Sequence, residues 1–300
     1  MNGPFDSQIN LLVERIRSYA DPLKEQALRL NEANALVGSD PLDADMWRST
    51  TVADSLVRAY HLIDQNFDPF GTTGVVAVSR YLFEMSVWLK LFDHDHRYGL
   101  VYYGELIYTQ TRYYESTLSQ MKRELSMLTE CAKRLKPQNG GQSKQAFYDA
   151  IAHEAARNFS IYAEQVMMHG YQNQVDLIRK LAIPQAESRL DELRVEQHTF
   201  DTHVLPGIED LWLNKSNEKR RWNWSDMARK VGMSFEYEYI YSFSSKMLHA
   251  TPSSISTDQV NLTPEEFIIF MRYIDAKLAD VLATSLVYCP AVRDDVEVRG

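Results

Sequence analysis

The chain has 300 residues, of which 41 are acidic and 32 basic, so its formal net charge is −9. This length supports one large domain or two ordinary domains without disulfides or structural metals. The acidic balance argues against a general nucleic-acid coat, because binding a polyanion requires clustered Lys and Arg. The two cysteines, Cys131 and Cys289, lie far apart, and no apolar run approaches the roughly 20 residues of a membrane span. A cytoplasmic location is therefore expected.

Glycine and proline are sparse, with 12 and 10 residues, and apolar positions recur at intervals of three and four. This pattern predicts an all-α protein. In the N-terminal third, helices are predicted over about residues 7–20, 21–36, 51–65 and 73–92. The second of these begins at an Asp-Pro pair, in which aspartate caps and proline starts the helix.

The middle of the chain predicts two unusually long helices, at residues 97–136 and 143–182, joined by a Pro-Gln-Asn-Gly-Gly turn. Apolar residues in the first follow the pattern of two antiparallel helices that pack on each other. A further helix is predicted at 185–202. The predicted fold is a multi-helix bundle with a long antiparallel helical hairpin.

In the C-terminal third, Ser225 is predicted to cap a short helix that ends at Gly232. A helix over residues 235–248 follows. The last helix is predicted to begin with a capping box formed by Thr263 and Glu266 and to reach about residue 285.

The predicted elements divide the chain into five segments. These are N-terminal helices, a first part of the core, a hairpin inserted into the core, a second part of the core and a flexible tail, at residues 1–48, 49–96, 97–206, 207–288 and 289–300. A long hairpin exposes an apolar seam, so we expect a homo-oligomer or a protein partner that binds through it.

Chemistry-bearing residues gather in two places. Tyr241, Ser245 and His249 recur at every fourth position and form one stripe on a helix. Arg80 and Glu84 lie four residues apart on an apolar segment, where burial demands that they pair with each other or with polar groups across the bundle.

Two interpretations of these five residues remain open. In the first, they form a structural polar network that fixes helix register. In the second, Arg80 holds an anion such as phosphate, Glu84 orients Arg80, and His249 donates or accepts a proton.

The same residues carry a resemblance to a known family. The motifs are Arg80-x-Leu82-x-Glu84, Trp224-Ser225 leading to Gly232, and Tyr241-x-x-x-Ser245-x-x-x-His249. Together they resemble the bacterial helical family called domain of unknown function 5677, over roughly residues 50–100 and 220–285. That family has no assigned function, so the resemblance implies the helical fold and the importance of the five positions but no reaction.

A metal-independent ribonuclease of the HEPN type is the enzyme alternative. No arginine in the chain is followed by a histidine at the spacing those enzymes use, and Arg194 and His198 come nearest. Such a nuclease would have to build its pair across helices, from Arg80 and His249.

A basic and aromatic segment at residues 215–230 has six positive and two negative side chains, a local charge of +4. Its Arg220, Arg221, Trp222 and Trp224 suit a local contact with single-stranded RNA or phosphate. The alternative is that the tryptophans only anchor a loop against the bundle.

No metal or cofactor is predicted. The chain has no Glu-x-x-His pair, Gly-rich loop, nucleophile elbow or CxxC motif, and the cluster at residues 93–96 is typical of a solvated helix end. Two hypotheses follow: a binding or effector protein of bacterial stress or phage defence, or a ribonuclease or phosphate-handling enzyme that uses Arg80 and His249. Whether the protein is an enzyme is open at this point.

Overall fold

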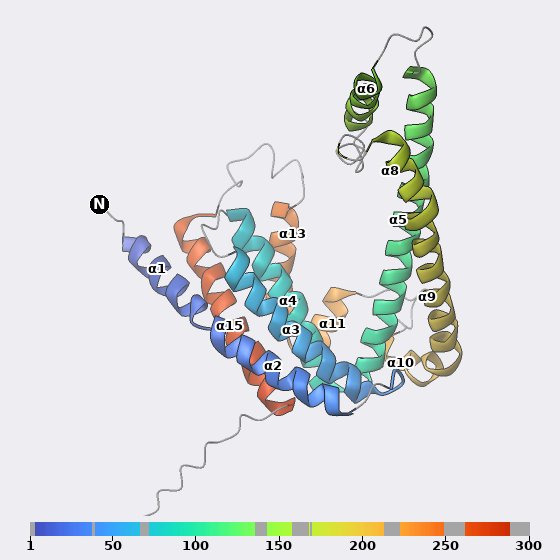
Figure 1. Ribbon diagram of the computed structural model, residues 1–300. Helices are drawn as coiled ribbons and strands as arrows, with labels where there is room; N and C mark the ends of the chain where they lie inside the picture. Colours follow the sequence, from blue (N-terminus) through green and yellow to red (C-terminus); the bar gives the residue numbers. More distant parts are fainter. Residues whose placement is uncertain are drawn as a thin grey trace, which may run out of the picture. The chain divides into compact units, whose positions relative to one another are not determined.

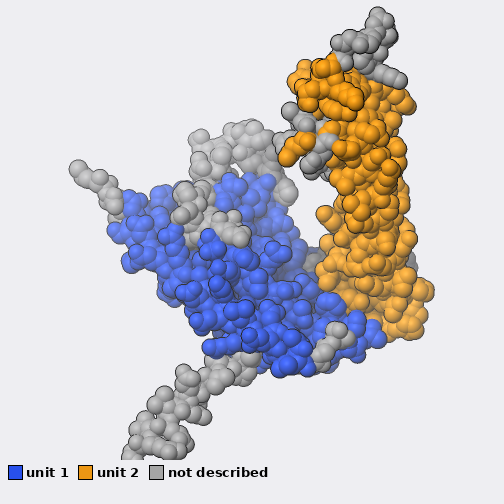
Figure 2. Space-filling view, in the orientation of Figure 1, with its two compact units in different colours: residues 1–102, 208–300 blue, residues 103–207 orange. Residues whose placement is uncertain are grey.

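In the computed structural model, every regular element of the described chain is a helix, which confirms the predicted all-α class (Figure 1). The described residues are 4–37, 40–66, 72–135, 143–157, 168, 170–212, 223–248 and 262–288. The chain forms two compact units (Figure 2). Unit 1 contains residues 1–102 and 208–300, and unit 2 contains residues 103–207.

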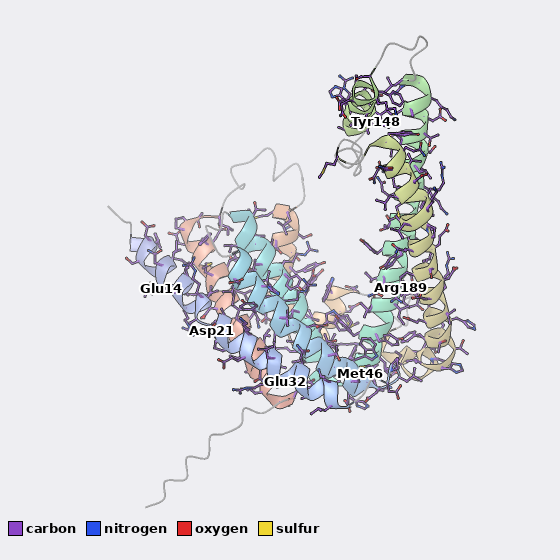
Figure 3. The ribbon with its side chains drawn as sticks, in the orientation of Figure 1. Glu14, Asp21, Glu32, Met46, Tyr148 and Arg189 are labelled. Atoms are coloured by element: carbon purple, nitrogen blue, oxygen red, sulfur yellow. The ribbon has the colours of Figure 1, made fainter. Side chains whose placement is uncertain are left out.

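Unit 1 is a bundle of long helices with a group of short ones. The long helices are α1 (Pro4–Arg17), α2 (Ala20–Val37), α3 (Ala44–Asn66), α4 (Thr72–His94) and α15 (Pro264–Tyr288). The short elements are α10 (Glu209–Trp212), α11 (Trp224–Lys230), α12 (Ser234–Glu236), the π-helix η3 (Tyr237–Tyr241) and α13 (Ser242–Leu248). Acidic side chains lie exposed on α1 and α2, among them Glu14, Asp21 and Glu32 (Figure 3).

Helix α4 is the centre of unit 1. It contacts α3, α11, η3, α13 and α15. Because neighbours surround it, its apolar residues cover most of its circumference instead of a single stripe. Its buried side chains include Val75, Val76, Leu82, Phe83 and Leu91, and burying each of the larger ones contributes about 2 kcal/mol. Polar residues on α4 therefore lie where the packing of five neighbours fixes them.

The start of α5 (Tyr98–Leu135) packs closely against the start of α3 at Gly99. A Cβ atom at this position would overlap the backbone carbonyl oxygen of Ala44 and lie 3.1 Å from Cγ of Arg48. Helix α3 begins earlier than predicted because Asp43 caps it, with its carboxylate accepting a hydrogen bond of 2.8 Å from the Asp45 amide.

The capping box predicted for the last helix is confirmed. The Thr263 amide donates to Glu266 Oε2 at 2.9 Å, and the Glu266 amide donates to Thr263 Oγ1 at 3.3 Å. The predicted cap of α11 is wrong, because Asn223 and not Ser225 is the capping residue. The Asn223 side chain accepts a hydrogen bond of 3.0 Å from the Ser225 amide.

Unit 2 contains most of α5, α6 (Lys144–Arg157), α8 (Tyr171–Leu177), the π-helix η1 (Ile178–Ala182), α9 (Ile183–His203) and the 3₁₀ turn η2 (Leu205–Gly207). The predicted helix at 143–182 and the predicted separate helix at 185–202 are both wrong in extent. Gly170 has φ 79° and ψ 147°, which no α-helix contains, so the break falls there. The helix then runs without interruption from Tyr171 to His203, and the π-turn of η1 precedes Pro184, where proline removes a regular hydrogen bond.

Helices α5 and α9 run antiparallel, and a ladder of polar contacts joins them. The Tyr108 hydroxyl donates to Asp201 Oδ1. Arg194 lies 3.6 Å from Glu115, and Lys122 lies 2.8 Å from Glu187. Each contact is seven residues further along α5 and seven residues back along α9, which is the repeat of an antiparallel coiled coil. We call these three contacts the heptad ladder.

The far end of α5 packs with α6 and α8 in a separate apolar cluster. Its buried members are Leu128, Cys131, Ile151, Ala152, Ala155, Val175 and Ile178. Burial raises the pKa of the Cys131 thiol. This end of unit 2 is therefore held by packing, and an Arg134–Glu154 ion pair of 2.6 Å lies at its edge.

Within the described residues, no helix is both long enough and apolar enough to cross a membrane.

Candidate functional site

Three of the predicted site residues meet in unit 1. Arg80 and Glu84 lie on α4, and Tyr241 is the last residue of η3. Arg80 Nε donates to Glu84 Oε1 at 3.1 Å, and Arg80 Nη2 donates to the Tyr241 hydroxyl at 3.2 Å. The guanidinium carbon also lies 4.5 Å from the centre of the Tyr241 ring. We call these three residues the Arg80 network.

The Arg80 network is half-buried. The side chains of Arg80 and Glu84 are 24% and 29% exposed, so they are less buried than their apolar helix suggests. Burial raises the pKa of Tyr241, and the positive charge of Arg80 opposes this. Tyr241 is therefore a neutral hydroxyl that accepts from Arg80 at neutral pH.

The π-helix η3 places Tyr241 among other aromatic rings. Tyr237 and Tyr241 stack with ring centres 5.1 Å apart and planes 17° apart. The rings of Phe83 and Trp224 lie 5.6 Å and 6.3 Å from Tyr241. A π-helix has more than four residues per turn, so side chains four positions apart lie more nearly above one another on it than on an α-helix. Tyr237 is thus part of the packing that orients Tyr241.

The other predicted site residues are not part of the Arg80 network. Ser245 is half-buried on α13, and its side chain makes no hydrogen bond with another described residue. Four predicted residues lie outside the described part of the chain: His249, Arg220, Arg221 and Trp222. Trp224, from the predicted basic and aromatic segment, is the first residue of α11.

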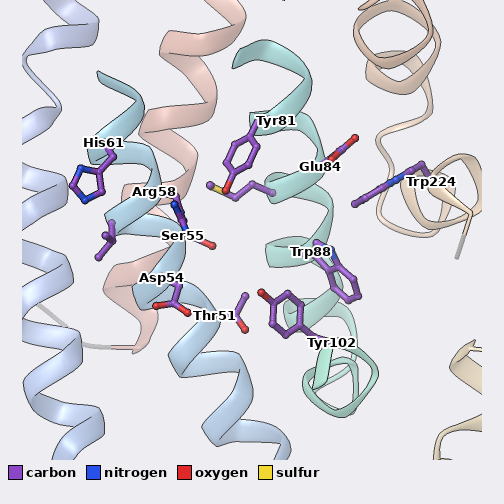
Figure 4. Close-up of a pocket in the computed structure, with 12 residues that line it drawn as sticks. Thr51, Asp54, Ser55, Arg58, His61, Tyr81, Glu84, Trp88, Tyr102 and Trp224 are labelled. Carbon is purple, nitrogen blue, oxygen red and sulfur yellow. The ribbon is translucent and has the colours of Figure 1, made fainter. Parts of the chain in front are cut away.

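A cavity of about 580 Å³ adjoins the Arg80 network and shares Glu84 with it (Figure 4). Helix α3 forms one wall, α4 forms the other, and single residues from α5 and α11 complete the lining. We call it the α3–α4 cavity. Its lining residues are Thr51, Asp54, Ser55, Val57, Arg58, His61, Tyr81, Glu84, Met85, Trp88, Tyr102 and Trp224.

One side of the α3–α4 cavity is aromatic. Trp88 and Tyr102 meet edge to face, with ring centres 5.1 Å apart and planes 86° apart. The Tyr102 side chain hydrogen-bonds Thr51, and burial raises its pKa. Tyr81 on α4 is 41% exposed, so its ring lies open to solvent.

The opposite side carries an acid and a base. Asp54 and Arg58 lie one turn apart on α3, and both side chains are exposed. Surrounding protein nevertheless desolvates Asp54 enough to raise its pKa, and the charge of Arg58 opposes the change. Neither side chain makes a hydrogen bond or an ion pair within 4.0 Å with another described residue. Both are therefore available to a ligand.

The α3–α4 cavity was not predicted. Its α3 residues form a polar stripe at spacings of three and four, from Thr51 through Asp54 and Arg58 to His61. That signal was present in the sequence, although it is the same signal that a solvated helix face gives. Only the approach of α4 and Tyr102 makes it the wall of a cavity.

A buried lysine near the Arg80 network was also missed. The Lys277 side chain on α15 is 8% exposed and lies 2.8 Å from Glu236 and 3.1 Å from Asp280. Its ammonium lies 5.4 Å from the Tyr273 ring. Burial lowers the pKa of Lys277, but the hydrogen bonds and charges of Glu236 and Asp280 together outweigh this and raise it overall. Lys277 thereby ties α12, directly before η3, to the core.

Within the described residues, no group of three or more His, Cys, Asp or Glu side chains is placed to hold a metal ion. In the predicted solvated cluster, Asp95 accepts hydrogen bonds from Arg97, the shortest at 2.8 Å from Nη2. These hydrogen bonds lower the pKa of Asp95.

A family model matches residues 80–266, and its description is family of unknown function (DUF5677). The match covers more than half of the chain, so the protein belongs to this family. The match begins at Arg80 and ends at Glu266, and unit 2 lies between these bounds. No curated protein and no solved structure matches the chain.

Proposed function

We propose that the protein is a small-molecule binding protein and that the α3–α4 cavity holds its ligand. The ligand we propose is planar, polar and heteroaromatic, of the nucleobase type. The observation that carries the proposal is an aromatic wall that faces, across one cavity, an acid and a base that form no ion pair within 4.0 Å with the described residues. Apolar and aromatic linings with a few well-placed polar groups are typical of ligand sites.

Each wall would recognise a different part of such a ligand. Trp88 and Tyr102 offer ring faces and edges for stacking, which contributes about 1–3 kcal/mol per base in nucleic-acid complexes. Asp54 accepts hydrogen bonds and Arg58 donates them, so together they match an edge that carries both donors and acceptors. The two formal charges cancel, which suits a neutral ring.

The Arg80 network supports binding more than catalysis. Its guanidinium is paired with Glu84, bonded to Tyr241 and stacked on the same ring. A phosphate would have to compete with a carboxylate that already neutralises the charge. We therefore propose that Arg80 holds Glu84 at the cavity edge, and that this chain is not a ribonuclease built on Arg80 and His249.

Titration of the protein with adenosine, guanosine, cytidine and uridine, followed by calorimetry, tests the proposal. We expect at least one nucleoside to bind wild type and Asp54→Ala to weaken it by about tenfold, the loss of one charge-assisted hydrogen bond. Asp64→Ala is the matched control, since Asp64 is exposed on the same helix and outside the cavity lining. Absence of binding by all four, or equal loss in both variants, would overturn the proposal.

The ribonuclease alternative has its own test. Degradation of single-stranded RNA by the purified protein, lost in a folded His249→Ala variant, would support catalysis and contradict the binding proposal.

We further propose that unit 2 contacts a protein partner or a second copy of the chain, in a bacterial cytoplasm and in a stress or defence setting. In support, Tyr113 on α5 and Val195 on α9 are 63% and 68% exposed. Light scattering of wild type and of a Tyr113→Ser, Val195→Ser double variant would detect self-association. A monomeric wild type would restrict the proposal to a different partner.

A further inference from the structure

A second cavity, of about 800 Å³, lies at the other end of α3. It is lined by the end of α2, the start of α3 and the end of α15, and Met46, one of its residues, is labelled in Figure 3. All of its lining residues lie outside residues 80–266, the part of the chain that matches the family. We call it the α2–α15 cavity. Its lining residues are Asn31, Asn34, Ala35, Asp43, Asp45, Met46, Arg48, Ser49, Thr50, Val287 and Tyr288.

The α2–α15 cavity contains buried polar atoms without hydrogen bonds. Arg48 Nε and Asn34 Nδ2 are buried and donate to no atom of the residues that the structure describes. The Tyr288 hydroxyl is buried and makes no hydrogen bond of ordinary geometry with the described residues. Burial raises the pKa of Tyr288, and the charge of Arg48 and a weak hydrogen bond with its side chain oppose this rise. Buried donors are normally paired, and an unpaired one is costly. Two unpaired N–H donors beside a weakly bonded hydroxyl in one cavity indicate a missing acceptor.

The remaining contacts fix the orientation of these donors. Asn34 Oδ1 accepts a hydrogen bond of 2.5 Å from the Ser49 hydroxyl, so its amide nitrogen is the free end. Arg48 Nη1 donates to Asp45 Oδ1 at 2.7 Å, and its guanidinium carbon lies 5.4 Å from the centre of the Tyr288 ring. The ion pair and the ring therefore hold Arg48 in place while Nε remains unused.

We infer that the α2–α15 cavity binds a small carboxylate. The Nε and Nη2 groups of an arginine form the edge that matches the two oxygens of a carboxylate. Nε on that edge is the unpaired donor of Arg48. The amide of Asn34 and the hydroxyl of Tyr288 supply further donors for a carboxylate or for a neighbouring carbonyl oxygen. The inference does not depend on the α3–α4 cavity.

The charges of the cavity bear on which carboxylates fit. Asp45 already neutralises Arg48, and Asp43 caps α3 with its side chain. Both aspartates are exposed. A ligand that also carries an ammonium group is therefore favoured over a dicarboxylate, because the ammonium can lie beside these two side chains.

Calorimetric titration with acetate, succinate, glycine and L-alanine, and with acetamide as the neutral analogue of acetate, tests the inference. We expect the amino acids to bind more tightly than succinate and acetamide not to bind. Arg48→Lys keeps the charge but loses the Nε–Nη2 edge, so we expect about a tenfold or greater loss of affinity. No binding by any carboxylate, or equal binding of acetate and acetamide, would overturn the inference.

Tyr288→Phe is the second variant, because it removes only a buried oxygen. If the Tyr288 hydroxyl forms its main hydrogen bond with the ligand, this variant loses affinity for the carboxylate, while its unfolding midpoint without ligand stays the same or rises. Loss of stability with unchanged affinity would instead assign the hydroxyl to the fold and contradict the inference. Asp64→Asn, at an exposed position outside the lining of both cavities, is the control and is expected to bind the carboxylates like wild type.

Discussion

Replacing Arg80 by methionine tests whether the Arg80 network stabilises unit 1. Arg80→Met removes an ion pair between half-buried side chains one turn apart, which is worth about 0.5 kcal/mol. It also removes a cation–π contact at 4.5 Å, worth about 1 kcal/mol, and a hydrogen bond to Tyr241, worth about 0.5–1 kcal/mol. Methionine retains most of the apolar stem. The expected loss in free energy of unfolding is therefore about 2 kcal/mol.

A double-mutant cycle that combines Arg80→Met with Tyr241→Phe isolates the hydrogen bond between Arg80 and Tyr241. Phenylalanine keeps the ring beneath the guanidinium and loses only the hydroxyl, so the single variant should lose about 0.5–1 kcal/mol. In the Arg80→Met background the same change should cost almost nothing, because the donor is already absent.

Urea unfolding followed by tryptophan fluorescence is the suitable assay. All five tryptophans of the chain belong to unit 1, so their signal reports the unfolding of that unit even if unit 2 unfolds separately. Arg29→Met, at an exposed arginine on α2, is the matched control and should change stability by less than about 0.5 kcal/mol. An Arg80→Met variant as stable as wild type, or additive losses of unfolding free energy in the double-mutant cycle, would refute a structural role for the Arg80 network.

Three other changes have defined outcomes. Gly99→Ala should lower the melting temperature strongly, since its Cβ would overlap a backbone carbonyl oxygen, whereas Gly207→Ala meets nothing within 4 Å and should leave it unchanged. Lys277→Met should cost about 2–3 kcal/mol in urea unfolding, because it leaves a partly buried carboxylate unpaired, and a neutral result would contradict the anchoring role. Arg97 holds the pKa of Asp95 below its unfolded value of about 3.9, so this contribution is complete above about pH 5 and is lost as pH falls through the folded pKa. Asp95→Asn should flatten the stability profile below pH about 4, and an unchanged profile would show that the pair contributes nothing.

Local signals in the sequence predicted local structure well. The capping box of Thr263 and Glu266 depends on residues three positions apart, and the structure confirms it. The helices of the N-terminal third follow from apolar spacing for the same reason. The predicted bounds of the helices at 143–182 and 185–202 were wrong because a single glycine is only a weak helix-breaking signal in a sequence, and the sequence does not show that Gly170 adopts a positive φ.

Most of the candidate site could not be predicted, because one sequence does not show which helices lie side by side. The sequence predicted that Arg80 and Glu84 pair with each other or with polar groups across the bundle, and in the structure both side chains lie in one network with Tyr241. The α3–α4 cavity could not be predicted, because Asp54 and Trp88 belong to it only when their helices lie side by side. The π-turn of η3 was also invisible, since its sequence fits an ordinary α-helix.

The heptad ladder of unit 2 determines the register in which α5 and α9 pack. Its ion pairs are exposed and contribute little stability individually. If α9 slipped by one heptad in one direction, Lys122 would face Arg194; in the other direction, Glu115 would face Glu187. Either slip sets like charges against each other, and only the observed register pairs opposite charges. The heptad ladder therefore selects one register of α5 against α9, where apolar packing alone would allow several.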